Sequence, residues 1–452
     1  MTSSSRPAVP TPMVNGFDRA DFDSLPPRAR HQIEERDRLL GPGYRLFYQD
    51  PLEVVQGSGT LLFDADGNDY LDVYNNVACV GHCHPYVADA VYRQLTTLNT
   101  NTRYLQQSIL DYSAQLLATM PAELGHVMYT CTGSEANDLA MRVARYCTGN
   151  DGIIVTANAY HGLSTAVSSF SPSLGIGVPL GPNVRTVRAP DALRTVGGAQ
   201  AVAAQLQSDL RAAIADLECH GYRLAAFVAD TIFSSDGVCA EPAGFLKPVI
   251  EDVHSAGGVF IADEVQPGFG RLGSSWWGFQ RHDIVPDIVT IGKPMGNGIP
   301  VAAAIFRPEL LTEFGRNIRY FNTFGGNSVS IAAAQAVLDV INNEKLIDNA
   351  DTVGRYIMSG IAALAANYQQ VTEVRGAGLF VGVDIVTDRK TSAPDADAAL
   401  RIVNHLRRRR VLISASGPQG SVLKIRPPLP FSTVDADRLL ENLEPVFAAE
   451  LH

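Results

Sequence analysis

The sequence predicts an α/β protein built on a mainly parallel sheet that is covered by helices, followed by a smaller α+β unit. Two observations lead to this fold class. Short, near-continuous apolar runs alternate with helical segments through the middle of the chain, and this order changes beyond about residue 345. Strands that are apolar on both faces are typical of parallel sheets buried between helices. The seven expected strands cover 127–130, 153–156, 185–188, 224–229, 258–262, 287–291 and 301–306.

Helical periodicity of apolar residues separates these strands and returns near the C-terminus. The expected helices cover 136–147, 201–219, 246–256 and 329–342, then a long helix after 345, and 395–408 and 434–450. Further strands are expected at 379–386, 411–414 and 422–425. The N-terminal part shows a Ser/Pro-rich lead (1–15), a charged helix (31–40) and two strands (59–64 and 69–74). We expect the lead to be disordered.

Composition excludes several classes of protein. The chain has 452 residues and a net charge of −11, which is the wrong sign for a protein that binds nucleic acid through its phosphates. No apolar stretch approaches the roughly 18 residues of a membrane span, and the lead lacks the apolar core of a signal peptide. Six cysteines in so long a chain do not form a disulfide framework, and the Cys/His cluster at 79–84 is too crowded for a metal site. We therefore expect a cytoplasmic protein without metal, membrane or nucleic-acid partners.

Two ionisable residues follow expected strands, at the sheet edge where ligands bind in such folds. Asp263 follows the run 258–262, and Lys293 follows 287–291. Lys293 is one of five lysines, and Pro294 and the glycines after it keep the chain in an open loop. Partial desolvation there would lower the pKa of its amine and favour imine formation. A helix cap or salt bridge for Asp263, and a buried ion pair for Lys293, are the structural alternatives.

Two glycine-containing turns precede expected helices. Gly133 and Ser134 open the helix at 136–147, with Ser134 as the expected N-cap, and 321–327 opens the helix at 329–342. Free N–H groups at the start of a helix bind anions, although each turn alone is also compatible with ordinary capping. Two such turns beside an acid and a lysine favour a phosphorylated cofactor. Tyr160 and His161 follow another strand and could place an aromatic face over a ring of this cofactor. A core position is the structural alternative for Tyr160.

Together these motifs resemble the class III aminotransferase family, whose members are fold type I enzymes that use pyridoxal 5′-phosphate (PLP). The resemblance runs from about residue 46 to the C-terminus. The stretch 261–271 (IADEVQPGFGR) resembles the strand whose aspartate, here Asp263, binds the pyridine nitrogen, while Gln266 reaches the ring oxygen. Lys293 in IGKP resembles the lysine that binds the cofactor aldehyde and moves protons in catalysis. The cofactor-binding residues implied are Gly133, Ser134, Tyr160, His161, Asp230, Asp263, Val265, Gln266, Lys293 and Thr323.

The resemblance also implies an architecture and an assembly. Fold type I joins a large domain with a seven-stranded sheet to a smaller α+β domain that is built from both chain ends. We place an N-terminal segment at 1–75, the PLP-binding domain at 76–330 and the C-terminal small domain at 331–452. The family is dimeric, with Thr323 approaching the cofactor phosphate from the partner subunit, so a homodimer is expected.

The sequence departs from many class III transaminases at their charge gate. The glutamate of that gate falls on Ser235 and its arginine partner falls on Lys424. The stretches 75–85, 98–103, 320–326 and 422–428 instead resemble the ethanolamine-phosphate and phosphohydroxylysine phospho-lyases. This resemblance implies elimination of phosphate and ammonia from a small phosphorylated amino alcohol, giving an aldehyde. Arg103, Lys424 and Asn76 are the candidate substrate residues, with structural ion pairs as the alternative for the two cations. The runner-up activity is an ω-aminotransferase that passes an amine to pyruvate or a similar keto acid.

Overall fold

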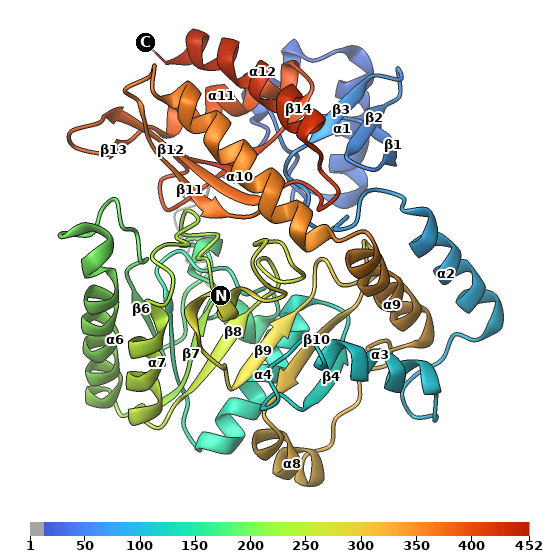
Figure 1. Cartoon of the computed structure of the whole chain (residues 1–452), viewed down its shortest axis with the longest axis vertical. Coiled ribbons are helices and arrows are strands. Elements are labelled where there is room, and N and C mark those ends of the chain that lie inside the picture. Colours follow the sequence, from blue (N-terminus) through green and yellow to red (C-terminus); the bar gives the residue numbers. More distant parts are fainter. Residues whose placement is uncertain (1–12, 452) are drawn as a thin grey trace, which may run out of the picture.

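A seven-stranded sheet forms the centre of the larger lobe in the computed structural model, which describes residues 13–451 (Figure 1). The strand order is β4-β10-β9-β8-β7-β5-β6. Only β10 runs against its neighbours, so the sheet is mainly parallel, as predicted. The strands are β4 (His126–Thr130), β5 (Gly152–Thr156), β6 (Val184–Val187), β7 (Leu224–Ala229), β8 (Val259–Asp263), β9 (Ile288–Ile291) and β10 (Ala302–Phe306).

Helices cover both faces of this sheet. Along β5, Ile153 and Val155 pack in one apolar cluster with α4 (Gly133–Thr148), whereas Ile154 packs in the other. That second cluster contains the apolar residues of α6 (Val202–Cys219) and α7 (Leu246–Ser255). Successive side chains of a strand point to opposite faces, so a strand with helices on both sides must be apolar throughout. This is why the sheet was readable as near-continuous apolar runs.

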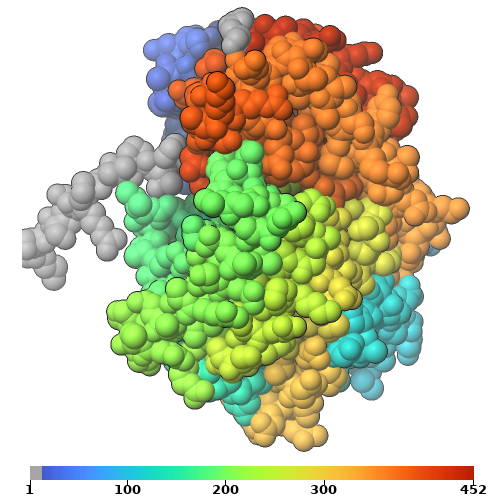
Figure 2. Space-filling view, turned by 60° about the vertical axis from the view of Figure 1, so that its left-hand side comes forward, coloured from blue at the N-terminus to red at the C-terminus, as the bar shows by residue number. Residues whose placement is uncertain are grey.

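The smaller lobe combines the two ends of the chain. β14 (Val411–Leu412) pairs in parallel with β3 (Asp69–Asp72), extending the sheet β1-β2-β3-β14. Figure 2 shows the blue N-terminal and red C-terminal segments side by side in this lobe. The predicted α+β unit from both chain ends is thus present, while the exact domain boundaries stay a prediction. The remaining strands are β1 (Val54–Ser58), β2 (Leu61–Asp64), β11 (Val371–Ala377), β12 (Phe380–Asp388), β13 (Ala393–Pro394), β15 (Ser414–Ser416) and β16 (Val422–Ile425).

The other helices surround these sheets, and several match the expected segments closely. The α-helices are α1 (Pro27–Leu40), α2 (Pro85–Thr97), α3 (Gln107–Leu117), α5 (Thr165–Ser168), α8 (Pro308–Asn317), α9 (Ser328–Asn343), α10 (Leu346–Ala365), α11 (Ala396–Arg408) and α12 (Thr433–Glu450). The 3-10 helices are η1 (Arg19–Ser24), η2 (Pro172–Leu174), η3 (Gly198–Ala201) and η4 (Gly278–His282). The sequence did not predict α2, α3, α8 or β11. Most of the expected disordered lead, 1–12, lies outside the described residues, but Asn15 is buried and accepts a hydrogen bond from Ser414 at 2.7 Å.

The side chains of the Cys/His cluster at 79–84 point to different surroundings and do not meet at one point. Cys79 is buried, His82 contacts Asp72 at 2.7 Å, and His84 contacts Glu344 at 3.2 Å. Between residues 13 and 451, no three His, Cys, Asp or Glu side chains are grouped so as to hold a metal ion. In the same part of the chain, none of the helices has the length and apolar character needed to cross a bilayer.

Candidate active site

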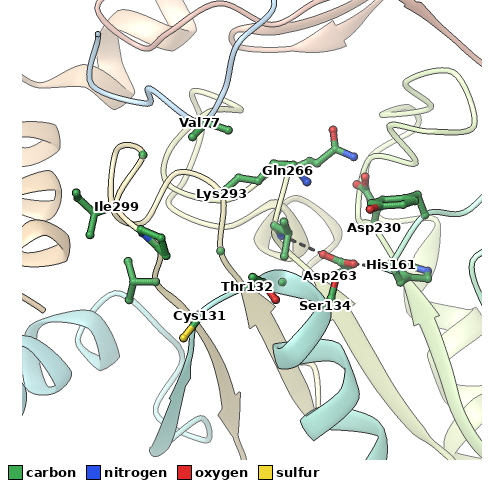
Figure 3. Close-up of a pocket in the computed structure, with 18 residues that line it drawn as sticks. Val77, Cys131, Thr132, Ser134, His161, Asp230, Asp263, Gln266, Lys293 and Ile299 are labelled. Atoms are coloured by element: carbon green, nitrogen blue, oxygen red, sulfur yellow. Dashed lines mark hydrogen bonds and ion pairs between the residues drawn. The ribbon is translucent and has the colours of Figure 1, made fainter. Parts of the chain in front are cut away.

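A cavity of about 330 Å³ lies at the carboxyl edge of the parallel strands (Figure 3). Residues that follow β4, β5, β7, β8 and β9 line it. Because β10 runs in the opposite direction, the residues that precede it reach the same edge. The lining residues are Val77, Cys131, Thr132, Gly133, Ser134, Tyr160, His161, Gly162, Asp230, Asp263, Val265, Gln266, Gly292, Lys293, Gly298, Ile299, Pro300 and Val301.

The amino-terminal end of α4 forms one wall. Thr132, not Ser134 as expected, is the N-cap: its Oγ1 accepts a hydrogen bond from the Glu135 N–H at 3.2 Å. The helix therefore begins two residues earlier than a Ser134 cap would allow, and Ser134 Oγ instead accepts from the Leu163 N–H at 3.1 Å. A Cβ at Gly133 would lie 3.0 Å from Val265, so a glycine lets the first turn approach β8 closely. The positive end of the helix dipole thus borders the cavity, where it favours an anion.

Asp263 ends β8 and lies 5% exposed on the cavity floor. Its Oδ2 accepts hydrogen bonds from His161 Nδ1 at 2.8 Å and Asn137 Nδ2 at 3.0 Å, and its Oδ1 accepts from the Val265 N–H at 3.1 Å. Figure 3 shows the contact between Asp263 and His161. Three donors hold the carboxylate in one orientation and stabilise its negative charge. Sequence reasoning missed Asn137, although it lies four residues after Gly133 and therefore on the same side of the helix.

Lys293 projects into the cavity from the loop after β9. Its Nζ lies 6.0 Å from the centre of the Tyr160 ring. The side chain is open to the cavity, but the protein around the cavity limits hydration. This desolvation, followed by the charge of Arg426, lowers the pKa of Lys293, whereas Asp263 and Asp230 oppose the shift. The structure thus gives Lys293 the depressed pKa that its sequence setting predicted.

Two buried basic residues at the end of β16, Lys424 and Arg426, contact the side chain of Gln266. Lys424 Nζ donates to Gln266 Oε1 at 3.2 Å and to the Ser234 carbonyl at 3.3 Å. Arg426 Nη1 donates to the same Gln266 oxygen, and its Nε donates to the Tyr74 carbonyl at 3.2 Å. Burial lowers the pKa of both groups, and the Arg426 charge lowers that of Lys424 further. Sequence reasoning found Lys424 but missed Arg426, although residues two apart in an extended chain point to the same side.

The turn after β7 contains Ser235, the position that a glutamate occupies in the charge gate of many class III transaminases. Asp230 accepts from the Ile232 N–H at 3.0 Å, from the Ser234 N–H at 3.1 Å and from the Ser234 hydroxyl. Burial raises the pKa of Asp230. Lys424 meets a backbone carbonyl of this turn, and neither Lys424 nor Arg426 forms an ion pair with a carboxylate in the described chain. The negative charge of Asp230 acts on both groups at a distance, but no salt bridge to a carboxylate occupies either of them within residues 13–451.

Asn76 does not line the cavity itself, but it contacts Gln266, which does. Asn76 is 1% exposed, and its Nδ2 donates to the Gln266 carbonyl at 3.5 Å. Its Oδ1 is buried and has no hydrogen-bond partner among residues 13–451. Asn76 therefore contacts the backbone of Gln266, and its own side-chain oxygen has no partner among the described residues.

Two predicted residues lie away from the cavity of their own chain. Arg103 is exposed, with its guanidinium 3.7 Å from the centre of the Phe321 ring. Thr323 belongs to the same surface region and does not line the cavity. The turn at 321–327 caps α9 in the ordinary way, because Asn327 Oδ1 accepts from the N–H groups of Val329 and Ser330. Arg103 therefore does not line the cavity of its own chain, and its contact with substrate stays a prediction.

The groups around the cavity match the chemistry of PLP. A lysine amine with a lowered pKa suits the cofactor aldehyde, an oriented carboxylate suits a protonated ring nitrogen, and the start of α4 suits a phosphate. The close approach of Gly133 to Val265 leaves the helix end open for that phosphate. The fold and the site together define a PLP-dependent enzyme of fold type I.

Within this class, the chain belongs to the class III aminotransferase family, whose profile (Aminotransferase class-III) matches residues 47–447. Its cofactor is accordingly PLP. The chain is 40% identical over 422 residues to an alanine–glyoxylate aminotransferase 2-like protein of Drosophila melanogaster, covering 90% of this chain and 85% of that one. It is 36% identical over 424 residues to ethanolamine-phosphate phospho-lyase homolog 1 of Caenorhabditis elegans, covering 90% and 91%. A solved phospholyase from Arthrobacter, in complex with phosphoethanolamine, superposes with a TM-score of 0.89 at 43% identity, over 92% of this chain and 99% of that one.

Proposed function

We propose that the protein is a PLP-dependent phospho-lyase acting on a small phosphorylated amino alcohol such as O-phosphoethanolamine. The observation that carries this proposal is the buried pair Lys424 and Arg426, which share the oxygen of Gln266 at the edge of the cavity. Two basic side chains that form no salt bridge with a carboxylate among residues 13–451 suit a dianionic phosphate. The similarity to a phospholyase solved with phosphoethanolamine and to a phospho-lyase homologue supports the same substrate class.

The proposed reaction removes a proton from Cα and breaks the bond between Cβ and the phosphate oxygen. Water then converts the remaining unsaturated amine to an aldehyde and ammonia, so one water is consumed and no electrons are gained or lost. Bound PLP supplies the electron sink that makes the Cα proton acidic. Lys293 takes that proton as general base. Lys424 and Arg426 bind the phosphate and stabilise the negative charge that develops on the leaving oxygen.

The remaining side chains hold the cofactor in this proposal. Asp263 keeps a proton on the ring nitrogen, and the first turn of α4 at Gly133 and Ser134 binds the cofactor phosphate. Gln266 accepts from Lys424 and Arg426 through Oε1, so it would donate to the ring oxygen of the cofactor through Nε2. The other residues that would hold the cofactor are Tyr160, His161, Val265 and Asp230, which line the cavity, and Asn76 is the further candidate for contacting the substrate.

We also propose that the active form is a homodimer in which Thr323 completes the phosphate site of the partner subunit. The surface around Arg103 supports this assembly, because Tyr104 is 68% exposed, Phe324 is 67% exposed and Leu105 is fully exposed. Apolar side chains gathered in this way mark interaction surfaces. Light scattering should give twice the chain mass. Mixing two inactive variants, Lys293→Ala and Thr323→Tyr, should restore part of the activity, because one site of the mixed dimer keeps both residues. A monomeric active enzyme would contradict the assembly.

One experiment separates the proposed activity from its rival. Enzyme is incubated with O-phosphoethanolamine and no keto acid, and inorganic phosphate, acetaldehyde and ammonia are measured over many turnovers. A phospho-lyase releases all three continuously and in equal amounts. The Lys293→Ala variant should lack both turnover and the visible absorbance of lysine-bound cofactor, since both depend on the amine.

The rival function is an ω-aminotransferase, which the similarity to the Drosophila aminotransferase-like protein favours. A transaminase would stop after one turnover and restart only when pyruvate is added, with alanine as product. That result would overturn the phospho-lyase proposal and leave the family assignment in place.

A further inference from the structure

Asn137 connects the cofactor-facing carboxylate to the sheet beneath it. The residue is 1% exposed on α4, and its Nδ2 donates to Asp263 Oδ2 at 3.0 Å and to the His161 carbonyl at 2.8 Å. Its Oδ1 accepts from the Thr290 hydroxyl at 2.8 Å. Every hydrogen-bonding atom of this amide therefore has a partner, which is required of a polar group so deeply buried.

The strand register explains why one side chain reaches these partners. Asp263 on β8 and Thr290 on β9 are opposite one another in the parallel ladder, so their side chains lie on neighbouring strands at the same height. Asn137 packs over this pair. The Asp263 carboxylate and the His161 carbonyl can only accept, so the NH₂ group of Asn137 faces them and its oxygen faces Thr290. The Thr290 hydroxyl donates to that oxygen and thereby supports the orientation in which Asn137 is a donor to the carboxylate.

We propose that Asn137 is a positioning residue that acts through Asp263, with Thr290 donating to its amide oxygen. The inference rests on the proposed role of Asp263 at the cofactor nitrogen. A hydrogen bond to Oδ2 holds the carboxylate toward the cavity and makes it a weaker acceptor for a shared proton. The proton between Asp263 and the ring nitrogen therefore stays on the nitrogen, where it is needed for the ring to draw electrons from the substrate.

Substitution of Asn137 tests this with a matched pair of variants. Asn137→Ala removes the donor at every pH. Asn137→Asp keeps the size of the side chain but places a second carboxyl group about 3 Å from Asp263, so that it donates only while protonated. Besides this new group, the titratable side chains that face the position are Asp263 and His161. Thr290→Val removes the hydroxyl that donates to the amide oxygen and nearly keeps the side-chain volume.

The direct readout is the ¹⁵N resonance of the pyridine nitrogen in enzyme loaded with ¹⁵N-labelled PLP. We expect the wild-type signal to be that of a protonated nitrogen, and Asn137→Ala to move it toward an unprotonated one. Thr290→Val should move it in the same direction by less, because Asn137 Nδ2 keeps its two acceptors. Asn137→Asp should resemble wild type at low pH and Asn137→Ala at high pH, adding an inflection that the wild-type enzyme lacks. Turnover should fall about tenfold in Asn137→Ala, the loss of one hydrogen bond to a charged group.

A purely structural role for Asn137 gives a different pattern. Leu139→Ala, a core substitution in the same helix, should lower the unfolding temperature and leave the nitrogen resonance unchanged. An unchanged resonance in Asn137→Ala, or the same pH dependence for Asn137→Ala and Asn137→Asp, would overturn the proposal. The resonance does not depend on which reaction the enzyme catalyses, so a failure of the phospho-lyase proposal would show separately, as absent phosphate release with an intact nitrogen signal.

Discussion

Replacing Arg426 by glutamine should weaken catalysis selectively for phosphorylated substrates. The variant removes one of the two cations that meet at Gln266 and leaves Lys424 bonded to the same oxygen, so no buried acceptor is abandoned there. A hydrogen bond to a charged group contributes about 1.5–3 kcal/mol, which corresponds to a loss of roughly 10- to 150-fold in kcat/KM. Release of inorganic phosphate from O-phosphoethanolamine, measured across substrate concentrations, gives this ratio directly.

The control for this prediction is a variant that keeps the positive charge at position 426. Arg426→Lys keeps the positive charge and loses only the second arm of the guanidinium, so it should retain more activity than the glutamine variant. Binding of ethanolamine, which has no phosphate, is followed by the change in cofactor absorbance and should shift less than about threefold in either variant. An equal loss for ethanolamine and its phosphate ester would refute the reasoning, because Arg426 would then support the fold of the site and not recognise the phosphate.

Three other substitutions test separate parts of the site. Asp263→Ala should bind PLP weakly and be nearly inactive, since nothing then keeps the ring nitrogen protonated; wild-type rates with added PLP would contradict this. Thr132→Ala removes the N-cap of α4 and should lower the free energy of unfolding by about 0.5–2 kcal/mol, with weaker cofactor binding measured by equilibrium dialysis. Asp236 is buried, and desolvation raises its pKa to about 6 from 3.8. Between these two pH values the folded chain keeps a proton that the unfolded chain has released, so the free energy of unfolding falls as pH rises, by up to about 3 kcal/mol. Asp236→Asn should flatten this part of the stability curve in denaturant titrations, and an unchanged slope would show that the shift is absent.

The pattern of apolar residues made the central sheet predictable. Elements without a regular apolar pattern were not predicted. The buried strands have side chains packed on both faces, which gives runs that no loop would show. The helices α2 and α3 expose Tyr92, Leu95 and Leu110 on their outer faces, so their apolar residues do not form one stripe and the helical period is blurred. Strand β11 alternates imperfectly because it contains a bulge, where the register shifts between Val371 and Glu373.

Site residues were predictable where a motif joined them to a strand end. Asp263 and Lys293 each follow an apolar run, and topology alone brings such positions to one edge. Arg426 and Asn137 depend on contacts between segments far apart in sequence, with Gln266 in one case and Thr290 in the other. Periodicity places them on the correct side of a strand or helix but does not name their partners. The opposite case is Arg103, whose motif was clear and whose position lies outside the cavity of its own chain.

The parallel pairing of β3 with β14 affects the order in which the chain can fold during synthesis. Leu71 lies opposite Val411, so a strand made near the start of synthesis finds its neighbour only after most of the chain has been translated. At about 5–20 residues per second, this interval lasts tens of seconds. Throughout it the β3 edge of the sheet β1-β2-β3 is unpaired, so its backbone N–H and C=O groups stay open to pairing with other chains until β14 is made.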